Sequence, residues 1–335
     1  MHTGKTYRLS EFLRWTRRSI FRHLLFAIIA TVLYQVFDFK WLSIPWPVVA
    51  LLGTATAFIV GFKNVQTYNR TWEARQIWGA AMSASRSWAL MCRDFIEDAN
   101  KSTEMIYRHF AWLTALRYQL RTAKNWETTD KSYNKEYKQF YTIPEKETPM
   151  EEELVKYIDK KELEQIMSKN NKAVQLLSLQ GIALKNLQTE GLLENFRFLE
   201  MHSALRELSA HQGKSERIKN FPYPRQYATV NELFVKLFCI LLPFALLGEF
   251  DHFNESVSGV LQGNMVWLVI PFSVLISWVY TSLEQVGEST ENPFEGNAND
   301  VPISQMSRSV EIDIREMLGE TNLPPILQPQ NNIVL

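Results

Sequence analysis

The chain has 335 residues, of which 46% are apolar and 13% aromatic, and its 36 basic residues balance its 36 acidic ones. A net charge of zero argues against a nucleic-acid-binding protein, which would be basic overall. Two cysteines, Cys92 and Cys239, are too few for a disulfide scaffold or a cysteine-rich zinc module. The ten tryptophans are high for such a chain, and aromatic belts at membrane interfaces would explain them.

Four uncharged stretches predict membrane-spanning helices, at residues 23–37, 41–62, 237–248 and 256–283. A helix needs about 20 apolar residues to cross a bilayer, and the second and fourth stretches reach that length. The first and third cross only if flanking residues contribute. The first has the basic start of a signal peptide, but no small-residue cleavage site follows it, so we interpret it as a retained helix.

The basic residues predict the orientation, because cytoplasmic segments of membrane proteins are rich in Lys and Arg. The N-terminal segment and the segment after the second stretch are basic, whereas the loop before the fourth stretch carries Glu249, Asp251 and Glu255 and no basic residue. We therefore expect an integral membrane protein with both termini in the cytoplasm. The expected organisation is 1–63 with two spans, a helical cytoplasmic region 64–230, 231–283 with two spans, and an acidic cytoplasmic tail 284–335.

The middle region has the pattern of helices. Residues 67–121 contain almost no Gly or Pro and place apolar residues at helical spacing. Residues 124–149 are polar and are expected to form a loop, after which helices are expected at 150–169, 173–189 and 192–211. Thr148 and Glu151 are a candidate capping box for the first of these. No alternation typical of strands is present, so the fold class is all-α.

The tail is acidic, and its charge complements the basic segments, so we expect it to dock on the cytoplasmic helices. Gly213-Lys214-Ser215 lacks the first glycine of a phosphate-binding loop, and the six histidines form no metal-binding pattern. No GxSxG motif occurs. We therefore expect no enzyme activity, no cofactor and no metal site.

The second stretch carries two helical stripes. Gly53, Ala57 and Gly61 are four residues apart, and small residues at that spacing let membrane helices approach closely. Thr54, Phe58 and Phe62 form the neighbouring stripe. Aromatic residues at this spacing are usually packing residues, but a ring of them around an axis would make a hydrophobic constriction that gates by dewetting.

From this stretch onward the sequence resembles the bestrophin family of pentameric ion channels, and in particular its bacterial members. The resemblance lies in Gly61-Phe62, in Tyr68-Asn69-Arg70-Thr71-Trp72-Glu73, in Tyr223-Pro224 and in Asn292-Pro293-Phe294, with Arg14-Trp15 and Ser19-Ile20 before the first span. Their order and spacing cover nearly the whole chain. Thr71 stands where the family commonly has Trp.

The resemblance implies a homopentamer around one axis, with Thr54, Phe58 and Phe62 lining a narrow neck and Tyr223 at a second constriction at the cytoplasmic exit. Thr54 and Tyr223 stand where aliphatic residues are usual. Animal members bind calcium after the Asn-Pro-Phe triplet, but Asn297 replaces one carboxylate here and only Asp300 is kept, so we expect no calcium site.

The function expected from this resemblance is an ion channel, with anion (chloride) selectivity by analogy with eukaryotic members. Its partners would be its own copies, membrane lipid and small inorganic ions, without nucleic acid. The alternatives are a channel of the same fold selective for monovalent cations, and a non-conducting membrane scaffold or sensor. A secondary transporter is disfavoured, because no internal repeat is visible and the long spans carry no ionisable residue.

Overall fold

The computed structural model describes residues 1–254, 256–259 and 262–335. Glu255, in the loop before the fourth predicted stretch, lies outside the described residues, as do residues 260 and 261 of that stretch. Within these ranges the regular secondary structure is helical, apart from isolated β-bridges at His2, Gln330 and Ile333. The all-α fold class is confirmed.

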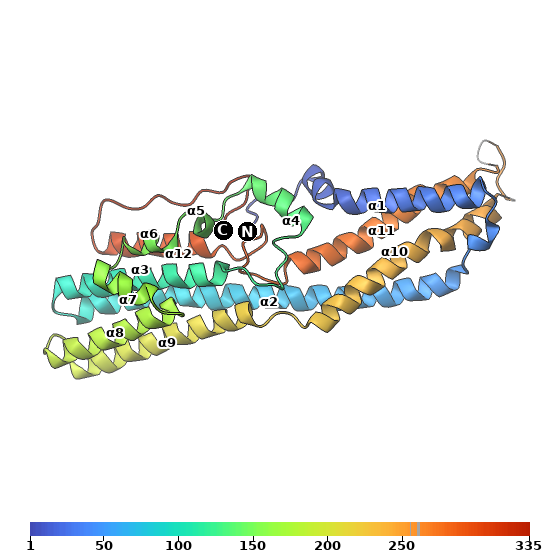
Figure 1. Ribbon diagram of the computed structural model, residues 1–335. Coiled ribbons are helices and arrows are strands. Elements are labelled where there is room, and N and C mark those ends of the chain that lie inside the picture. The colour runs from blue at the N-terminus through green and yellow to red at the C-terminus, as the bar shows by residue number, and fades with distance from the viewer. Residues whose placement is uncertain (255, 260–261) are drawn as a thin grey trace.

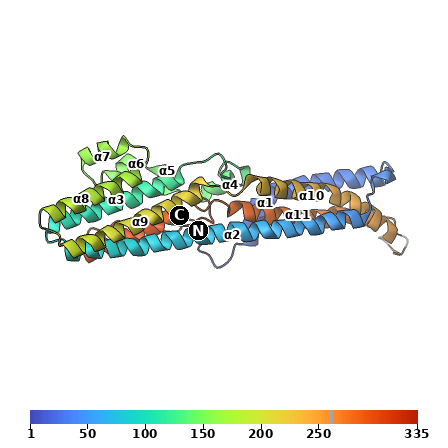
Figure 2. The same cartoon turned by 90° about the horizontal axis from the view of Figure 1, so that it is seen from below.

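The molecule is elongated and has two halves joined along one helix, α2 (Trp46–Phe95), which runs through both of them (Figures 1 and 2). The span half holds the first part of α2 together with α1 (Leu9–Gln35), α10 (Arg225–Phe253) and α11 (Val269–Ser289). Short 3₁₀ turns lie at Lys40–Leu42 and Met265–Leu268. The remaining helices make up the other half, which we call the extramembrane half.

Among the described residues, three helical segments are long and apolar enough to cross a membrane: Lys40–Phe95, Arg225–Phe253 and Met265–Ser289. Helix α1 does not meet that composition, because it begins at Leu9 and carries the basic residues of the N-terminal segment. It lies along α11 in the span half, where the Trp278 Nε1 atom donates to the Thr16 Oγ1 atom at 2.9 Å. That α1 also crosses the membrane, as the first predicted stretch implies, stays a prediction.

The extramembrane half is a layered bundle, and the second part of α2 runs along one edge of it in Figure 2. Its long helices are α3 (Ala99–Arg121), α8 (Lys172–Thr189), α9 (Asn195–Asn220) and α12 (Ile303–Met317). Three tryptophans, Trp78, Trp88 and Trp112, are fully buried in its core. These large apolar rings, fixed between helices, supply much of the area removed from water in this half.

The segment between α3 and α8 differs from the sequence prediction. Residues 124–149 contain the short helices α4 (Ser132–Tyr137) and α5 (Pro144–Glu147), with a 3₁₀ turn at Lys138–Phe140. The expected helix 150–169 is divided into α6 (Met150–Leu154) and α7 (Lys160–Met167). The capping box is wrong, because Pro149 is the N-cap and no side chain caps α6. Asp159 instead caps α7, and its carboxylate accepts from the Glu162 backbone N–H at 2.8 Å.

The acidic tail docks on the helices, as the sequence predicts. Ile303, Val310 and Ile314 of α12 are buried in the core of the extramembrane half, and Leu335 is buried in a smaller cluster. The two ends of the chain lie side by side (Figure 1), and the Thr3 backbone N–H donates to the Asn332 carbonyl at 2.7 Å.

One buried histidine makes stability depend on pH. The His109 imidazole lies between the rings of Trp88 and Trp112, at centroid distances of 6.3 and 5.0 Å, and burial lowers the pKa of His109 to about 3. In the unfolded chain the His109 imidazole takes up a proton near pH 6.5, whereas in the folded chain it stays neutral until the pH is close to 3. The stability that neutral His109 contributes above pH 6.5 is therefore lost as the pH falls toward 3. We expect this group to lower the free energy of unfolding by about 2 kcal/mol between pH 6.5 and pH 5.

Thermal unfolding at these two pH values measures the effect. His109→Phe should remove this component of the pH dependence, whereas the exposed His202, changed to Gln, should leave it in place. An unaltered pH dependence in the His109 variant would contradict the assignment.

Candidate pore-lining face and the joint between the halves

The stripe that carries Thr54, Phe58 and Phe62 lies on the surface of the subunit. Phe58 is 67% exposed and Phe62 56% exposed, although both are large and apolar. Their rings contact each other edge to face, with centroids 4.5 Å apart. Thr54 is exposed as well, and its hydroxyl donates to the Ala50 carbonyl at 3.0 Å. The predicted neck residues therefore share one exposed face, and their role in a neck stays a prediction.

The opposite face of α2 is buried inside the subunit. Gly53 contacts α10, where a Cβ atom at residue 53 would come within 2.6 Å of the Phe238 ring, and its carbonyl accepts from the Tyr280 hydroxyl at 3.1 Å. Ala57 and Gly61 are exposed, and a Cβ atom at Gly61 would meet nothing within 4 Å. Of the predicted packing stripe, only Gly53 contacts helices of the same subunit. That Ala57 and Gly61 allow close approach of a helix stays a prediction, and that helix would belong to a neighbouring copy of the chain.

The exposed stripe continues well beyond the predicted neck, which the sequence reasoning did not anticipate. It runs along α2 at intervals of three or four residues, one side of a helix, and none of its members is charged. Its residues, in order, are Leu51, Thr54, Phe58, Phe62, Val65, Asn69, Trp72, Gln76, Ala80, Ser83, Ser87 and Leu90. The signal was present in the sequence, because charged residues are missing at this one helical phase from residue 51 to residue 90.

A buried ion pair marks the inner end of the span half. The Lys63 side chain is 3% exposed, and its ammonium group lies 2.6 Å from the Glu284 carboxylate of α11. The Asn231 side chain of α10 also donates to Glu284. The pair therefore ties three span helices together where α2 leaves the span half, on the side of α2 away from the exposed stripe.

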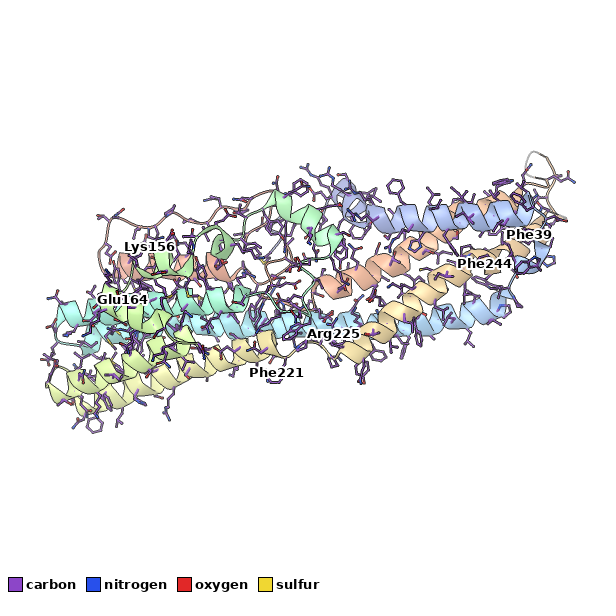
Figure 3. The ribbon with its side chains drawn as sticks, in the orientation of Figure 1. Phe39, Lys156, Glu164, Phe221, Arg225 and Phe244 are labelled. Carbon is purple, nitrogen blue, oxygen red and sulfur yellow. The ribbon has the colours of Figure 1, made fainter. Side chains whose placement is uncertain are left out.

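Tyr223 lies at the joint between the halves. Helix α9 ends at Asn220 and α10 begins at Arg225, and Figure 3 shows Phe221 and Arg225 on either side of the narrow connection. The Tyr223 ring is half-buried and lies 6.4 Å from that of Tyr227. This position is about midway along the molecule, away from the far end of the extramembrane half. The role of Tyr223 as an exit constriction stays a prediction.

At the joint, α2 contacts two segments that are far from it in the sequence, the end of α9 and the residues after α11. The Arg70 guanidinium of α2 donates to the carbonyls of Ile218 and Phe221 at the end of α9, and to the Glu291 carbonyl at 2.9 Å. The Thr71 hydroxyl donates to the Thr290 carbonyl at 2.7 Å. Because the last carbonyls of a helix have no partners within it, an arginine fork is well suited to satisfy two of them together.

The segment after Asn292-Pro293-Phe294 folds against the loop that follows α3. The Glu295 carboxylate accepts from the Thr128 backbone N–H at 2.9 Å and from its hydroxyl at 2.6 Å. Asp300 accepts from the Gly296 backbone N–H at 2.7 Å and forms an ion pair with Arg121 at 3.4 Å. Burial, with Asp300 close by, raises the pKa of Glu295 above its ordinary value.

These residues do not fit a calcium ion. The Asn297 side chain donates to Glu295, and Asp300 has the Arg121 guanidinium as its counterion, so the cation position beside Asp300 is filled by the protein itself. Across the part of the chain that the structure describes, no group of three or more His, Cys, Asp or Glu could hold a metal. A hard cation takes six to eight oxygen ligands and favours carboxylates that are free of other cations, and Asp300 is already paired with Arg121.

We therefore expect micromolar calcium to leave the melting temperature unchanged relative to equimolar magnesium. Differential scanning fluorimetry of the purified protein in each salt measures this. A rise in melting temperature with calcium that is absent with magnesium, and that Asp300→Asn removes, would contradict the expectation.

Together these features define a class: an α-helical integral membrane protein whose longest helix presents an uncharged exposed face. A family model described as bacterial/fungal bestrophin protein matches residues 10–316, so the chain belongs to the bestrophin family. This confirms the family that the sequence motifs indicate.

Relatives and solved structures agree with this assignment. The voltage-dependent anion channel-forming protein YneE of Escherichia coli K12 is 28% identical over 286 residues, which are 85% of this chain and 81% of that protein. The voltage-dependent anion channel-forming protein RSc3414 of Ralstonia nicotianae is 25% identical over 279 residues, covering 82% of this chain and 78% of that one. A crystal structure of a bacterial bestrophin homologue from Klebsiella pneumoniae is 25% identical, with a TM-score of 0.74 over 92% of this chain and 99% of that one.

Proposed function

We propose that the protein is a homopentameric channel that passes anions, chloride among them, through the bacterial inner membrane, with α2 of each subunit facing the axis. The single observation that carries this proposal is the uncharged exposed stripe of α2. A soluble protein or a lipid-facing helix has no need for one helical phase that stays uncharged and exposed from the span half into the extramembrane half. A wall of a water-filled path, apolar at a neck and polar beyond it, has that composition.

The neck of this channel would be formed by Thr54, Phe58 and Phe62. Five copies of each Phe would make two stacked apolar rings one helical turn apart. An ion in such rings loses favourable contacts with water and meets no fixed charge in return, so the rings act as a barrier and not as a binding site. Beyond the rings, Asn69, Gln76 and Ser83 supply hydrogen-bonding groups to a wetter path.

Anion selectivity is supported by the relatives, whose names describe anion channels. The orientation is supported by the basic N-terminal segment, which would keep both termini in the cytoplasm. The extramembrane half would then be cytoplasmic.

Recordings from purified protein in a planar bilayer test conduction and selectivity together. Under a potassium chloride gradient, the reversal potential is expected near the chloride equilibrium potential. A reversal potential near that of potassium would show a cation channel of the same fold, and the absence of current would favour a scaffold or sensor.

The oligomeric state has a separate test. We expect a mass of five subunits by multi-angle light scattering after correction for detergent. A mass of one or two subunits would refute the axial pore, because the α2 stripe of a monomer or dimer cannot enclose a path.

A further inference from the structure

A recess beside the exposed stripe of α2 has no role in the proposed channel. Its volume is about 350 Å³, and it lies between the N-terminal segment 1–7 and the part of α2 that follows the neck, with Thr290 and Asn299 at its side. This volume is within the range of pockets that hold small organic molecules. The segment is held there at both ends: the Thr3 hydroxyl donates to the Asn332 carbonyl at 3.0 Å, and the Tyr7 hydroxyl to the Asn299 side chain at 2.8 Å.

The charges in the recess are all of one sign. Lys5 and Arg75 contribute to its lining, and no Asp or Glu does. No described carboxylate makes an ion pair with either cation. Their neighbours differ in this respect, since Arg70 of the same helix binds three carbonyls and Arg86 pairs with Asp313. Two unpaired cations that share a recess attract an anion, and arginine in particular matches the planar geometry of a carboxylate.

The recess also has an aromatic wall. Tyr68 and Trp72 of α2 lie with their rings nearly parallel, at an interplanar angle of 13°, and both are exposed. On the N-terminal segment, the half-buried His2 ring stacks on the Tyr7 ring with centroids 4.0 Å apart, and its Nε2 atom is buried without a hydrogen-bond partner. An unpaired polar atom at this depth costs free energy unless a bound group satisfies it.

A glycine allows this arrangement. A Cβ atom at residue 4 would come within 2.6 Å of the His2 ring, so a side chain there would displace that ring from its stack on Tyr7. The N-terminal segment is thereby shaped into one wall of the recess.

We propose that this recess binds a small planar organic anion, a carboxylate on an aromatic ring, with Arg75 and Lys5 on the carboxylate and Trp72 against the ring. The site is complete within one subunit and does not depend on the proposed channel function. Because Trp72 also belongs to the exposed stripe, a bound anion would lie beside the proposed ion path on the extramembrane side of Phe62.

Isothermal titration calorimetry of the purified full chain with sodium benzoate and with sodium acetate tests the proposal. Benzoate is expected to bind more tightly than acetate. Arg75→Gln should weaken benzoate binding at least tenfold, and Arg75→Lys should weaken it less. Trp72→Leu should bring benzoate down to the affinity of acetate. Arg86→Gln, the matched control on the same helix outside the recess, should bind like the wild type.

Equal benzoate affinity in Arg75→Gln and Arg86→Gln would overturn the site, as would a lack of benzoate binding by the wild type. Equal affinity for acetate and benzoate in the wild type would overturn the aromatic wall as a determinant. Should Arg75→Gln fail to fold, Lys5→Gln, which changes an exposed residue before the first helix, replaces it with the same expected direction. A protein that binds benzoate but conducts no ions would refute the channel and leave the site in place.

Discussion

Replacing Phe58 and Phe62 together by alanine is expected to raise the single-channel conductance roughly tenfold, the effect of lowering the barrier by about 1.4 kcal/mol. The two rings are exposed on one face of α2 and contact each other. Alanine widens the path at both levels and allows water to enter, without adding or removing charge. The reversal potential under a salt gradient should therefore remain that of the wild type.

The control for this double variant is Phe21→Ala. Phe21 is as exposed as Phe58 but lies on α1, away from the α2 stripe. It should leave conductance unchanged. Should the Phe58 and Phe62 variant also leave conductance unchanged while its melting temperature falls slightly, the two rings face lipid and the gate is refuted.

Replacing Arg121 by methionine is expected to destabilise the protein by about 3–5 kcal/mol, as loss of one partner of a buried ion pair does. The Arg121 side chain is 2% exposed and lies 3.6 Å from the Glu145 carboxylate and 3.4 Å from that of Asp300. Glu145 keeps Arg117 as a second ion-pair partner, whereas Asp300 keeps hydrogen-bond donors and the electrostatic influence of the N-terminal ammonium group. Asp300 is then a buried carboxylate that has lost its ion-pair partner.

Thermal and denaturant unfolding measure this loss. Adding Asp300→Asn to the Arg121→Met variant should restore part of the stability, because the unpaired charge is removed. Arg93→Met, which changes an exposed arginine paired with its neighbour Asp94, should change the melting temperature little. An Arg121→Met variant as stable as Arg93→Met would contradict the role of this ion pair.

The sequence predicts the helical class and the apolar segments because each depends on local composition. It does not predict that the span ending at Phe62 and the helix that follows are one element, α2, of 50 residues. Lys63 looks like the end of a span, yet it is buried and paired with Glu284, 221 residues further on. A partner so distant in the chain cannot be read from the local pattern.

The same limit applies to the candidate site. The stripe of Thr54, Phe58 and Phe62 can be predicted from helical spacing, and its exposure in the subunit agrees with the family resemblance. The recess at Lys5 and Arg75 could not be predicted, since its two cations are 70 positions apart and meet only through the fold. Arg121, Glu145 and Asp300 are likewise brought together by three separate segments.

The connections between the two halves differ in stiffness, because one is a continuous helix and another is a short non-helical segment. Among the described residues only α2 passes from one half to the other as an unbroken helix, whereas the path from α9 to α10 passes through the non-helical residues 221–224. Phe58 is about 18 Å along α2 from Arg70, the residue that binds the end of α9. A tilt of α2 by about 5° about Arg70 displaces Phe58 by about 1.6 Å, close to the radius of a water molecule. In the proposed channel, such a tilt of α2 about Arg70 would change the width between the Phe58 rings of neighbouring subunits.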